Sequence, residues 1–380
     1  MPVLAFLHAS RRCLALGLVA GPVLAMAQIP PAVPVAPTAP EPAWRAANAA
    51  VGQFPRGHAD LLKWEQEQAR VAAPAPAPAT PEARPDLTLA TAEQAVRQAW
   101  RAHRELARPL ARLDATQAQQ LADGRWLELD PSLNWRIDDF GELLEAAVQA
   151  RKAWTEAVLG RETLTPLRQA LAAAEAAHEL GQRMVSVGNW SRLQQAPVQL
   201  ARTQARMNLH RAQYAAAEAQ ARLLKTLGLS GLHDAVGLPA QLPALTDDGM
   251  SEAEFRRRLG AIQSELPRGN RPRNQADAVL AFEAYQASLA LASASQDELL
   301  PLRQYISEET VLHYNGMLKS SWDLLTEVQN QAQARTGALA ARRDFELARI
   351  ELQSVLLGGE SAGAFSLGAG GGAAPQPAGH

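Results

Sequence analysis

Cysteine, aromatic residues and long apolar runs are scarce in this sequence. Its 380 residues include one cysteine, Cys13, and only 5% aromatic residues. Cys13 lies in an N-terminal segment with the features of a cleaved export signal, so we expect neither disulfides nor cysteine catalysis in the mature chain. No later segment offers about 18 consecutive apolar residues, which excludes a transmembrane helix. A net charge of −2 gives no electrostatic reason to expect a nucleic-acid partner.

The export signal is predicted over residues 1–27. Arg11 and Arg12 form its basic region, residues 14–24 form its apolar run, and a cleavage site of small residues ends at Ala27. The apolar run is too short to cross a membrane as a helix. We therefore expect an exported protein.

The rest of the chain divides by composition into helical parts and linkers. The chain is Ala-, Gln-, Glu- and Arg-rich, which favours long helices over a thick mixed core. Segments rich in Pro, Ala or Gly separate the helical parts and read as linkers or tails. The predicted segments in chain order are Pro/Ala-rich linkers at 28–85 with a short helical island at 44–70, a first repeat at 86–230, a linker at 231–250, a second repeat at 251–358 and a disordered tail at 359–380.

Each repeat contains a glycine-marked turn followed by a helix that ends at another glycine. Gly188 and Gly228 are 40 residues apart (228−188), and Gly316 and Gly358 are 42 apart (358−316). A Pro-Leu-Arg-Gln sequence precedes both turns, at 166–169 and 301–304. Two long helical hairpins of matched reach favour a tube or rod over an enzyme pocket.

Six helical stretches follow from this pattern. Capping-box spacing marks three helix starts, at Ser191 with Gln194, Ser251 with Glu254, and Ser320 with Asp323. Helices are predicted over about 89–122, 139–187 and 191–227 in the first repeat, and over about 251–265, 274–313 and 320–357 in the second.

The helix after Gly188 carries a seven-residue series of apolar positions. A sustained series of this period predicts left-handed coiled-coil packing. The predicted packing seam is Leu193, Leu200, Met207, Tyr214 and Ala221, with a companion row at Ala196, Thr203, His210, Ala217 and Leu224.

These residues resemble the TolC family of outer-membrane efflux proteins over about residues 87–358. The family's turn pattern is a glycine, then a small polar residue, an acid and two aliphatic residues. Gly316, Ser320, Asp323, Leu324 and Leu325 fit the pattern with one extra residue, whereas the first turn carries Gln194 in place of the acid. The resemblance implies two repeats, each with a long helical hairpin, in a trimer whose helical tunnel lies below a twelve-stranded membrane barrel.

The sequence departs from the family where membrane strands are expected. In the first repeat the gap between helices leaves room only for a minimal β-hairpin at 125–137, and barrel strands need about 9–11 residues each. In the second repeat the gap over 267–273 is Pro- and Arg-rich, which excludes a membrane strand. The predicted fold is therefore all-α, with two repeats of long antiparallel coiled-coil hairpins and at most that small hairpin.

The resemblance also assigns candidate sites. The hairpin tips would contact a periplasmic adaptor protein, and an acid near the second tip would narrow the tunnel entrance. An acidic ring would favour cations in the pore. The alternatives are ordinary loops at the tips and a purely capping role for Asp323. The candidate residues are Gly188, Asn189, Trp190, Ser191, Arg192, Gly316, Met317, Leu318 and Lys319 at the tips, and Asp323 and Glu327 at the entrance.

We find no catalytic or cofactor motif in the sequence. There is no nucleophile elbow, phosphate loop or metal-ligand pattern. The pairs Met207 with His210 and His313 with Met317 lack a third ligand within a turn, so packing explains them better than copper binding. We expect a protein that is not an enzyme and has no cofactor and no metal.

Together these expectations describe an exported protein of the outer membrane or periplasm of a Gram-negative bacterium. It would be a homotrimeric, passive duct component of an efflux system, working with a periplasmic adaptor and an inner-membrane pump. The competing hypotheses are a periplasmic coiled-coil scaffold or adaptor that has lost the membrane barrel, and a metal-storage protein.

Overall fold

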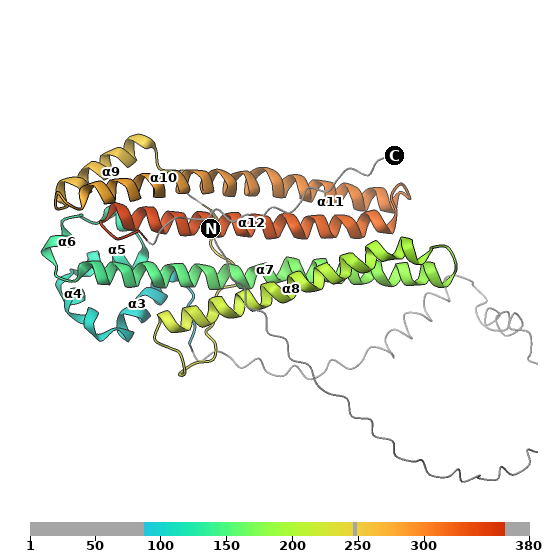
Figure 1. Ribbon diagram of the computed structural model, residues 1–380, viewed down its shortest axis with the longest axis horizontal. Coiled ribbons are helices and arrows are strands. Elements are labelled where there is room, and N and C mark those ends of the chain that lie inside the picture. The colour runs from blue at the N-terminus through green and yellow to red at the C-terminus, as the bar shows by residue number, and fades with distance from the viewer. Residues whose placement is uncertain (1–86, 246–248, 362–380) are drawn as a thin grey trace, which may run out of the picture. The chain divides into compact units, whose positions relative to one another are not determined.

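The computed structural model describes residues 87–245 and 249–361, which belong to the second of two units of the chain, Pro81–His380. The predicted export signal, the helical island and the Pro/Ala-rich linkers at 28–85 lie outside the described residues, as do residues 362–380 of the predicted tail. The described residues are helical apart from loops and one isolated parallel bridge between Thr88 and Gly237 (Figure 1). None of the described helices is both long and apolar enough to cross a membrane.

Two long antiparallel hairpins dominate this unit, as predicted (Figure 1). The expected capping boxes start the second arm of each hairpin, because Ser191 with Gln194 and Ser320 with Asp323 exchange both hydrogen bonds. A π-helical turn interrupts the first arm of the second hairpin. The first hairpin consists of α7 (Phe140–Ser186) and α8 (Arg192–Thr226), and the second of α10 (Arg271–Ala294), the π turn η3 (Ser295–Leu299), α11 (Leu300–Asn315) and α12 (Ser321–Leu356). A shorter helix, α9 (Glu252–Glu265), precedes α10.

The predicted single helix over 89–122 is wrong. The backbone is extended at His103 and Leu113, and Asp114 then starts a new helix through a capping box with Gln117. The breaks let the short helices fold back on α7 instead of running past it. They are α3 (Ala92–Ala102), η1 (Arg104–Leu106), α4 (Ala107–Arg112) and α5 (Ala115–Asp123).

The minimal β-hairpin that the sequence allowed at 125–137 does not form, in keeping with the predicted all-α fold. These residues form a 3₁₀ turn, η2 (Trp126–Glu128), and a one-turn helix, α6 (Leu133–Arg136). Trp126 is buried and its indole N–H donates to the Leu121 carbonyl at 2.8 Å. Asp130 accepts the Ser132 N–H at 2.9 Å and turns the chain. Trp126, Leu129, Leu133 and Ile137 therefore enter a helical core.

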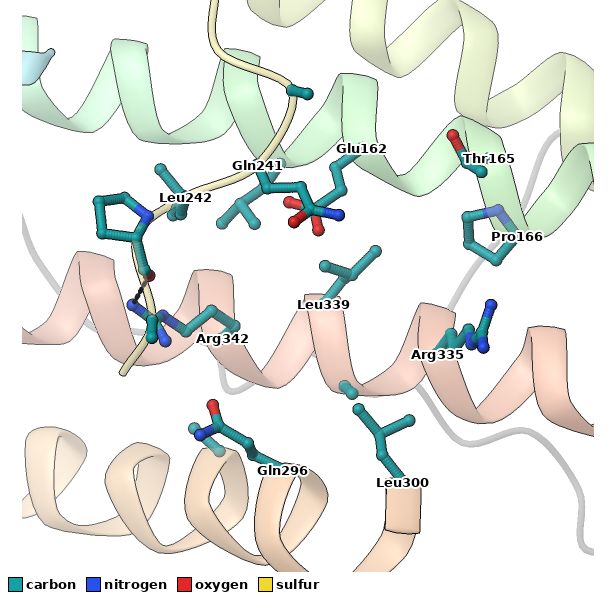
Figure 2. Close-up of a pocket in the computed structure, with 16 residues that line it drawn as sticks. Glu162, Thr165, Pro166, Gln241, Leu242, Gln296, Leu300, Arg335, Leu339 and Arg342 are labelled. Atoms are coloured by element: carbon teal, nitrogen blue, oxygen red, sulfur yellow. Dashed lines mark hydrogen bonds between the residues drawn. The ribbon is translucent and has the colours of Figure 1, made fainter. Parts of the chain in front are cut away.

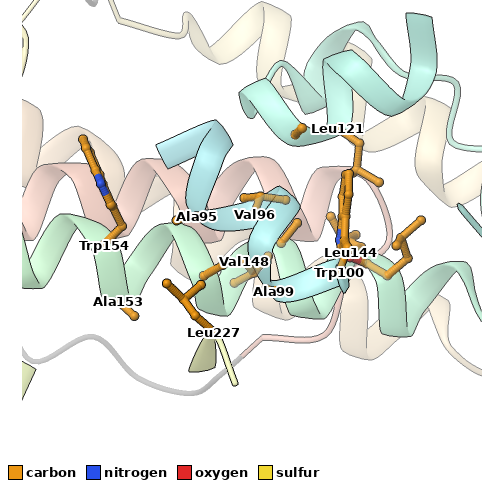
Figure 3. Packing of buried hydrophobic residues seen from close by; sticks show 14 of the residues in the cluster. Ala95, Val96, Ala99, Trp100, Leu121, Leu144, Val148, Ala153, Trp154 and Leu227 are labelled. Atoms are coloured by element: carbon orange, nitrogen blue, oxygen red, sulfur yellow. The ribbon is translucent and has the colours of Figure 1, made fainter. Parts of the chain in front are cut away.

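The core lies at the end of the hairpins away from their tips. Large side chains of α3, α5 and α7 fill it, and Figure 3 shows Trp100, Leu121 and Leu144 packed together there. The buried indoles find backbone acceptors, since Trp100 donates to Leu143 and Trp154 donates to Leu89. A second core joins α9, α10 and α12, where other aromatic rings stack. We call this end of the two hairpins the base.

The four long arms form one layer in the order α10/α11, α12, α7, α8. Each arm packs on its neighbour in this order, and no substantial contact joins α8 to α10 or α11 within the described part of the chain (Figure 1). At the base, a buried ion pair between Lys152 and Glu351 ties α7 to α12. The layer is therefore open, with α8 as one edge and α10/α11 as the other.

Candidate functional site

The first hairpin turns at Gly188, as the sequence predicted. Gly188 has a left-handed backbone (φ +80°), and the Asn189 and Trp190 N–H groups both return to the Met184 carbonyl, at 2.9 and 3.1 Å. The Ser191 hydroxyl then accepts the Gln194 N–H and starts α8. Gly188, Asn189, Ser191 and Arg192 are exposed at this tip. Four of the five residues proposed for a partner contact are thus available.

The second turn has a different geometry. Gly316 has an ordinary negative φ of −79°, and Met317 takes the left-handed conformation at φ +60°. A left-handed backbone is uncommon for a residue with a side chain and costs about 1–2 kcal/mol. The side chains at this tip point into solvent, with Met317 93% and Leu318 76% exposed. The second tip is therefore an apolar projection held on a strained turn.

Trp190 does not share this exposure. It is half-buried, and its ring stacks on Trp322 with ring centroids 4.7 Å apart and planes inclined by 21°. Its other neighbour is Gly181 of α7, where an added Cβ would lie 3.4 Å from the Trp190 ring. Trp190 is thus less exposed than the other four residues of this tip, because its ring joins the two hairpins to each other. Sequence reasoning missed Trp322, whose only signal was a second tryptophan beside the second turn.

The two acids predicted at a tunnel entrance occupy unlike environments. Asp323 is exposed and caps α12, accepting from the Ser320 N–H at 2.8 Å and from the Ser320 hydroxyl at 2.7 Å. These hydrogen bonds lower the pKa of Asp323. Glu327 is 6% exposed and lies 3.6 Å from Arg303. Asp323 has the predicted capping role, whereas Glu327 is buried against α11 instead of facing solvent.

The predicted seam of α8 points away from α7. Leu193 is 82% exposed and Tyr214 73% exposed, although both belong to the seven-residue series. The side of α8 that faces α7 carries a different series, in which four of the eight residues are alanines. Its members are Val198, Arg202, Ala205, Leu209, Ala212, Ala216, Ala219 and Leu223, all buried or half-buried.

These two series lie on opposite sides of one helix. Met207 precedes the buried Leu209 by two residues, and each residue turns an α-helix by about 100°, so the two side chains point roughly 160° apart. The small inner series allows close approach, because an added Cβ at Gly160 of α7 would lie 3.5 Å from the Ala216 backbone. We call Leu193, Leu200, Met207 and Tyr214 the α8 outer stripe. The stripe is an apolar seam with no partner in the described chain.

The opposite edge of the layer also exposes large apolar side chains. On α11, Tyr305 is 59% exposed and Leu312 60% exposed, and these residues are seven apart. Leu200 lies 12 residues after Gly188 (200−188), and Tyr305 lies 11 residues before Gly316 (316−305). At 1.5 Å per residue, both are about 17–18 Å from their tips. The Trp190–Trp322 stack joins the two hairpins near their tips, and the first hairpin extends further than the second (Figure 1). The apolar positions of the two edges are therefore matched only in their distance from the tip of their own hairpin.

A cavity of about 610 Å³ opens between α7, α12 and the π turn η3, beneath the crossing segment 240–244 (Figure 2). Its charged groups hold that segment in place. Arg342 donates to the Pro243 carbonyl at 3.0 Å. Burial raises the pKa of Glu162, while a hydrogen bond from the Leu242 backbone and the charge of Arg342 oppose the rise. The arrangement anchors a chain crossing and offers no nucleophile with an adjacent base.

Comparison with known proteins adds little beyond the helical arrangement. No family model and no curated protein matches the sequence. Solved structures do match, and two of them are described here. One is CusC, described in a study of folding and transmembrane channel formation, with 12% identity, a TM-score of 0.46, and coverage of 70% of this chain and 92% of that chain. The other is a membrane protein from Pseudomonas aeruginosa, with 16% identity, a TM-score of 0.41, and coverage of 74% and 93%.

Proposed function

We propose that this chain is a wall segment of a passive duct, assembled from three copies and serving an efflux system of the outer membrane or periplasm. The observation that carries the proposal is the open four-helix layer with an unpartnered apolar edge on each side. An exposed apolar seam with a seven-residue period is stable only when another helix covers it. When α11 of one copy packs on the α8 outer stripe of the next copy, the contact covers one edge of each copy. Three copies joined in this way close a ring that leaves no edge exposed.

The tip of the second hairpin is the proposed contact for an adaptor protein. Met317, Leu318 and Lys319 project from it, and all three are exposed. Flexible Met and Leu side chains suit a protein contact. Asn189 and Arg192 of the first tip would supply polar contacts at its rim. The duct itself would catalyse no reaction and bind no cofactor, and an inner-membrane pump would supply energy.

The burial of Glu327 favours a second candidate function. A pore-lining acid has to face the lumen to attract cations, and Glu327 instead lies against Arg303. A periplasmic scaffold that conducts nothing would have no need of such an acid. Its hairpins would serve only to hold partner proteins.

Fractionation and native mass measurement separate the two candidates. A duct predicts that the native protein fractionates with outer membranes and has three times the mass of the mature chain. A freely soluble periplasmic monomer would contradict the duct. Replacing Leu200 and Tyr214 of the outer stripe with Gln is expected to release monomers. Replacing the exposed residues Arg206 and Asn208 with Gln, outside the stripe, is the matched control.

A further inference from the structure

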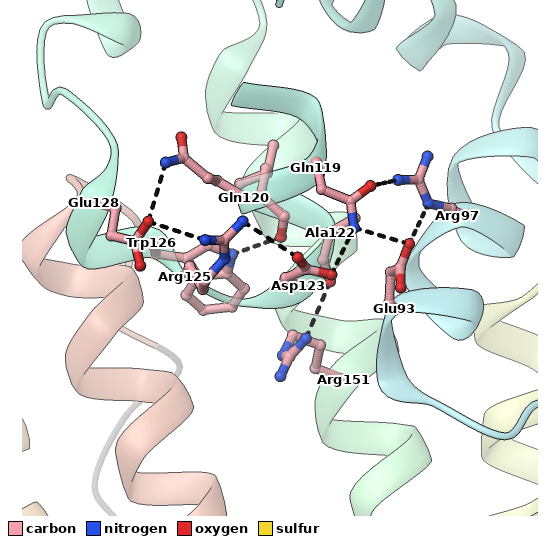
Figure 4. A network of polar contacts seen from close by, with 11 residues as sticks. Glu93, Arg97, Gln119, Gln120, Ala122, Asp123, Arg125, Trp126, Glu128 and Arg151 are labelled. Atoms are coloured by element: carbon pink, nitrogen blue, oxygen red, sulfur yellow. Dashed lines mark hydrogen bonds and ion pairs between the residues drawn. The ribbon is translucent and has the colours of Figure 1, made fainter. Parts of the chain in front are cut away.

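Arg151 of α7 is a half-buried guanidinium without a carboxylate partner. It donates to the Ala122 carbonyl at 3.0 Å, and no carboxylate of the described residues lies within 4.0 Å of it. The neighbouring arginines are all paired. Arg125 lies 3.5 Å from Asp123, and Arg349 lies 2.5 Å from Glu346. Figure 4 shows Arg151 below the Arg125–Asp123 pair, with a hydrogen bond to the Ala122 carbonyl of α5.

A cavity of about 520 Å³ borders Arg151 and has an excess of positive charge. Four arginines line it against three carboxylates, and every one of these carboxylates already has an arginine partner. Glu93 pairs with Arg97, which does not line the cavity, so the Glu93 carboxylate offsets less of the positive charge of the four lining arginines. The lining charges are Arg125, Arg151, Arg342 and Arg349 against Glu93, Asp123 and Glu346.

The start of α3 adds to this potential. Thr91, Ala92 and Glu93 form the first turn of that helix and line the same cavity. The N-terminal end of a helix carries the positive end of its dipole and free N–H groups, both of which attract anions. Two independent features therefore favour negative charge in this cavity.

Burying the charge of Arg151 without a carboxylate partner lowers the stability of the fold. Burial, and next the nearby charge of Arg349, lower the pKa of Arg151 to about 10. Capping α5 explains only part of its placement, since a backbone acceptor engages one of the five N–H groups of a guanidinium. Gly124 makes room for the group, because an added Cβ there would lie 2.4 Å from the Arg151 Cζ. Arg151 also lines a second cavity of about 320 Å³, so the rest of its guanidinium is open to both spaces.

We propose that the cavity between α3, α5, α7 and α12 is a binding site for a small oxyanion, a phosphate or carboxylate group held by Arg151 with Arg349 and Arg125 beside it. Guanidinium groups bind both kinds of oxyanion through paired hydrogen bonds. The site lies at the base, away from the tips and edges, so it does not depend on the proposed duct. A bound anion would lock α3 and α5 onto the two hairpins.

Thermal unfolding of the full chain tests the proposal with phosphate and acetate as separate probes, against chloride at the same ionic strength. A ligand at ten times its Kd is expected to raise the Tm by roughly 3–6 °C. Arg151→Met should abolish the rise, and Arg151→Lys should reduce it. Arg256→Met, an exposed arginine of α9 outside both cavities, is the matched control and should keep the full rise.

Two results would show that the site does not bind an oxyanion, and a third would identify its ligand. Wild-type protein with the same Tm in phosphate, acetate and chloride has no oxyanion site, and this measurement does not require the variants to fold. An equal rise in Arg151→Met places any binding elsewhere. A rise with phosphate alone or acetate alone supports the site and identifies which oxyanion it takes.

Discussion

Trp190 and Trp322 form the contact between the two hairpin tips. Stacked aromatic pairs contribute about 0.5–1.5 kcal/mol beyond the area that they bury. A double-mutant cycle with Trp190→Ala and Trp322→Ala is therefore expected to show a coupling energy in that range. Unfolding in denaturant measures it, and Trp135→Ala, a 44% exposed tryptophan at the base, is the control. Additive effects of the two tip substitutions would mean that the stack does not stabilise the fold.

The two turn glycines have equivalent places in the sequence and different backbones in the structure. Gly188→Ala forces a side chain into φ +80° and is expected to lower the unfolding free energy by about 1 kcal/mol. Gly316→Ala should be neutral or stabilise by up to about 1 kcal/mol, because φ is −79° and an added Cβ meets only ordinary contacts at 3.5 Å or more. Parallel denaturant titrations of the two variants check this, and equal losses would contradict the geometry.

At the scale of the element, α8 has two seams and uses one of them within the chain. Leu209→Ala removes a buried side chain and is expected to cost about 2 kcal/mol, the lower end for leucine, since the residue keeps 8% exposure. Met207→Ala, two residues away on the outer stripe, should change stability by less than about 0.5 kcal/mol. Both are measured at a protein concentration low enough to keep the chain monomeric. A larger loss at Met207 than at Leu209 would reverse the assignment of the two sides.

The sequence predicts those elements whose signals are local. The starts of α8 and α12 follow from Ser191 and Ser320, because a cap needs only residues within one turn. The seam of α8 was assigned to the larger side chains of the outer stripe, while the fold uses Ala205, Ala212 and other small residues that permit close packing. Size alone cannot show which of two seven-residue series meets a partner in the same chain.

Long-range packing decides the rest of the elements. Residues 125–137 are long enough for a minimal β-hairpin, yet Trp126 and Leu133 are buried in a core built by α7 and its neighbours. For the candidate site, the exposure of Met317 at a turn could be predicted, since loops lie on the surface. The Trp190–Trp322 stack and the burial of Glu327 could not, because both depend on how the hairpins lie against each other.

For the whole molecule, the central claim is that the open layer closes by joining α8 of one copy to α11 of the next. Leu200 and Tyr305 lie 12 and 11 residues from the turn glycines of their own hairpins (200−188 and 316−305), and both hairpins point the same way (Figure 1), so the claim is specific to a parallel arrangement of copies. These two edges make no substantial contact with each other within the described chain. A covalent link between them therefore reports on contact between copies.

Disulfide cross-linking tests this most directly. The chain carrying Leu200→Cys and Tyr305→Cys, with Cys13 outside the described residues as its only native cysteine, is oxidised and separated by mass under denaturing conditions. The duct predicts covalent dimers and trimers that reducing agent dissolves, and Leu209→Cys with Tyr305→Cys, which places one cysteine on the buried side of α8, should give none. Monomers alone from the Leu200 and Tyr305 pair, under conditions where both thiols are reactive, would contradict the account.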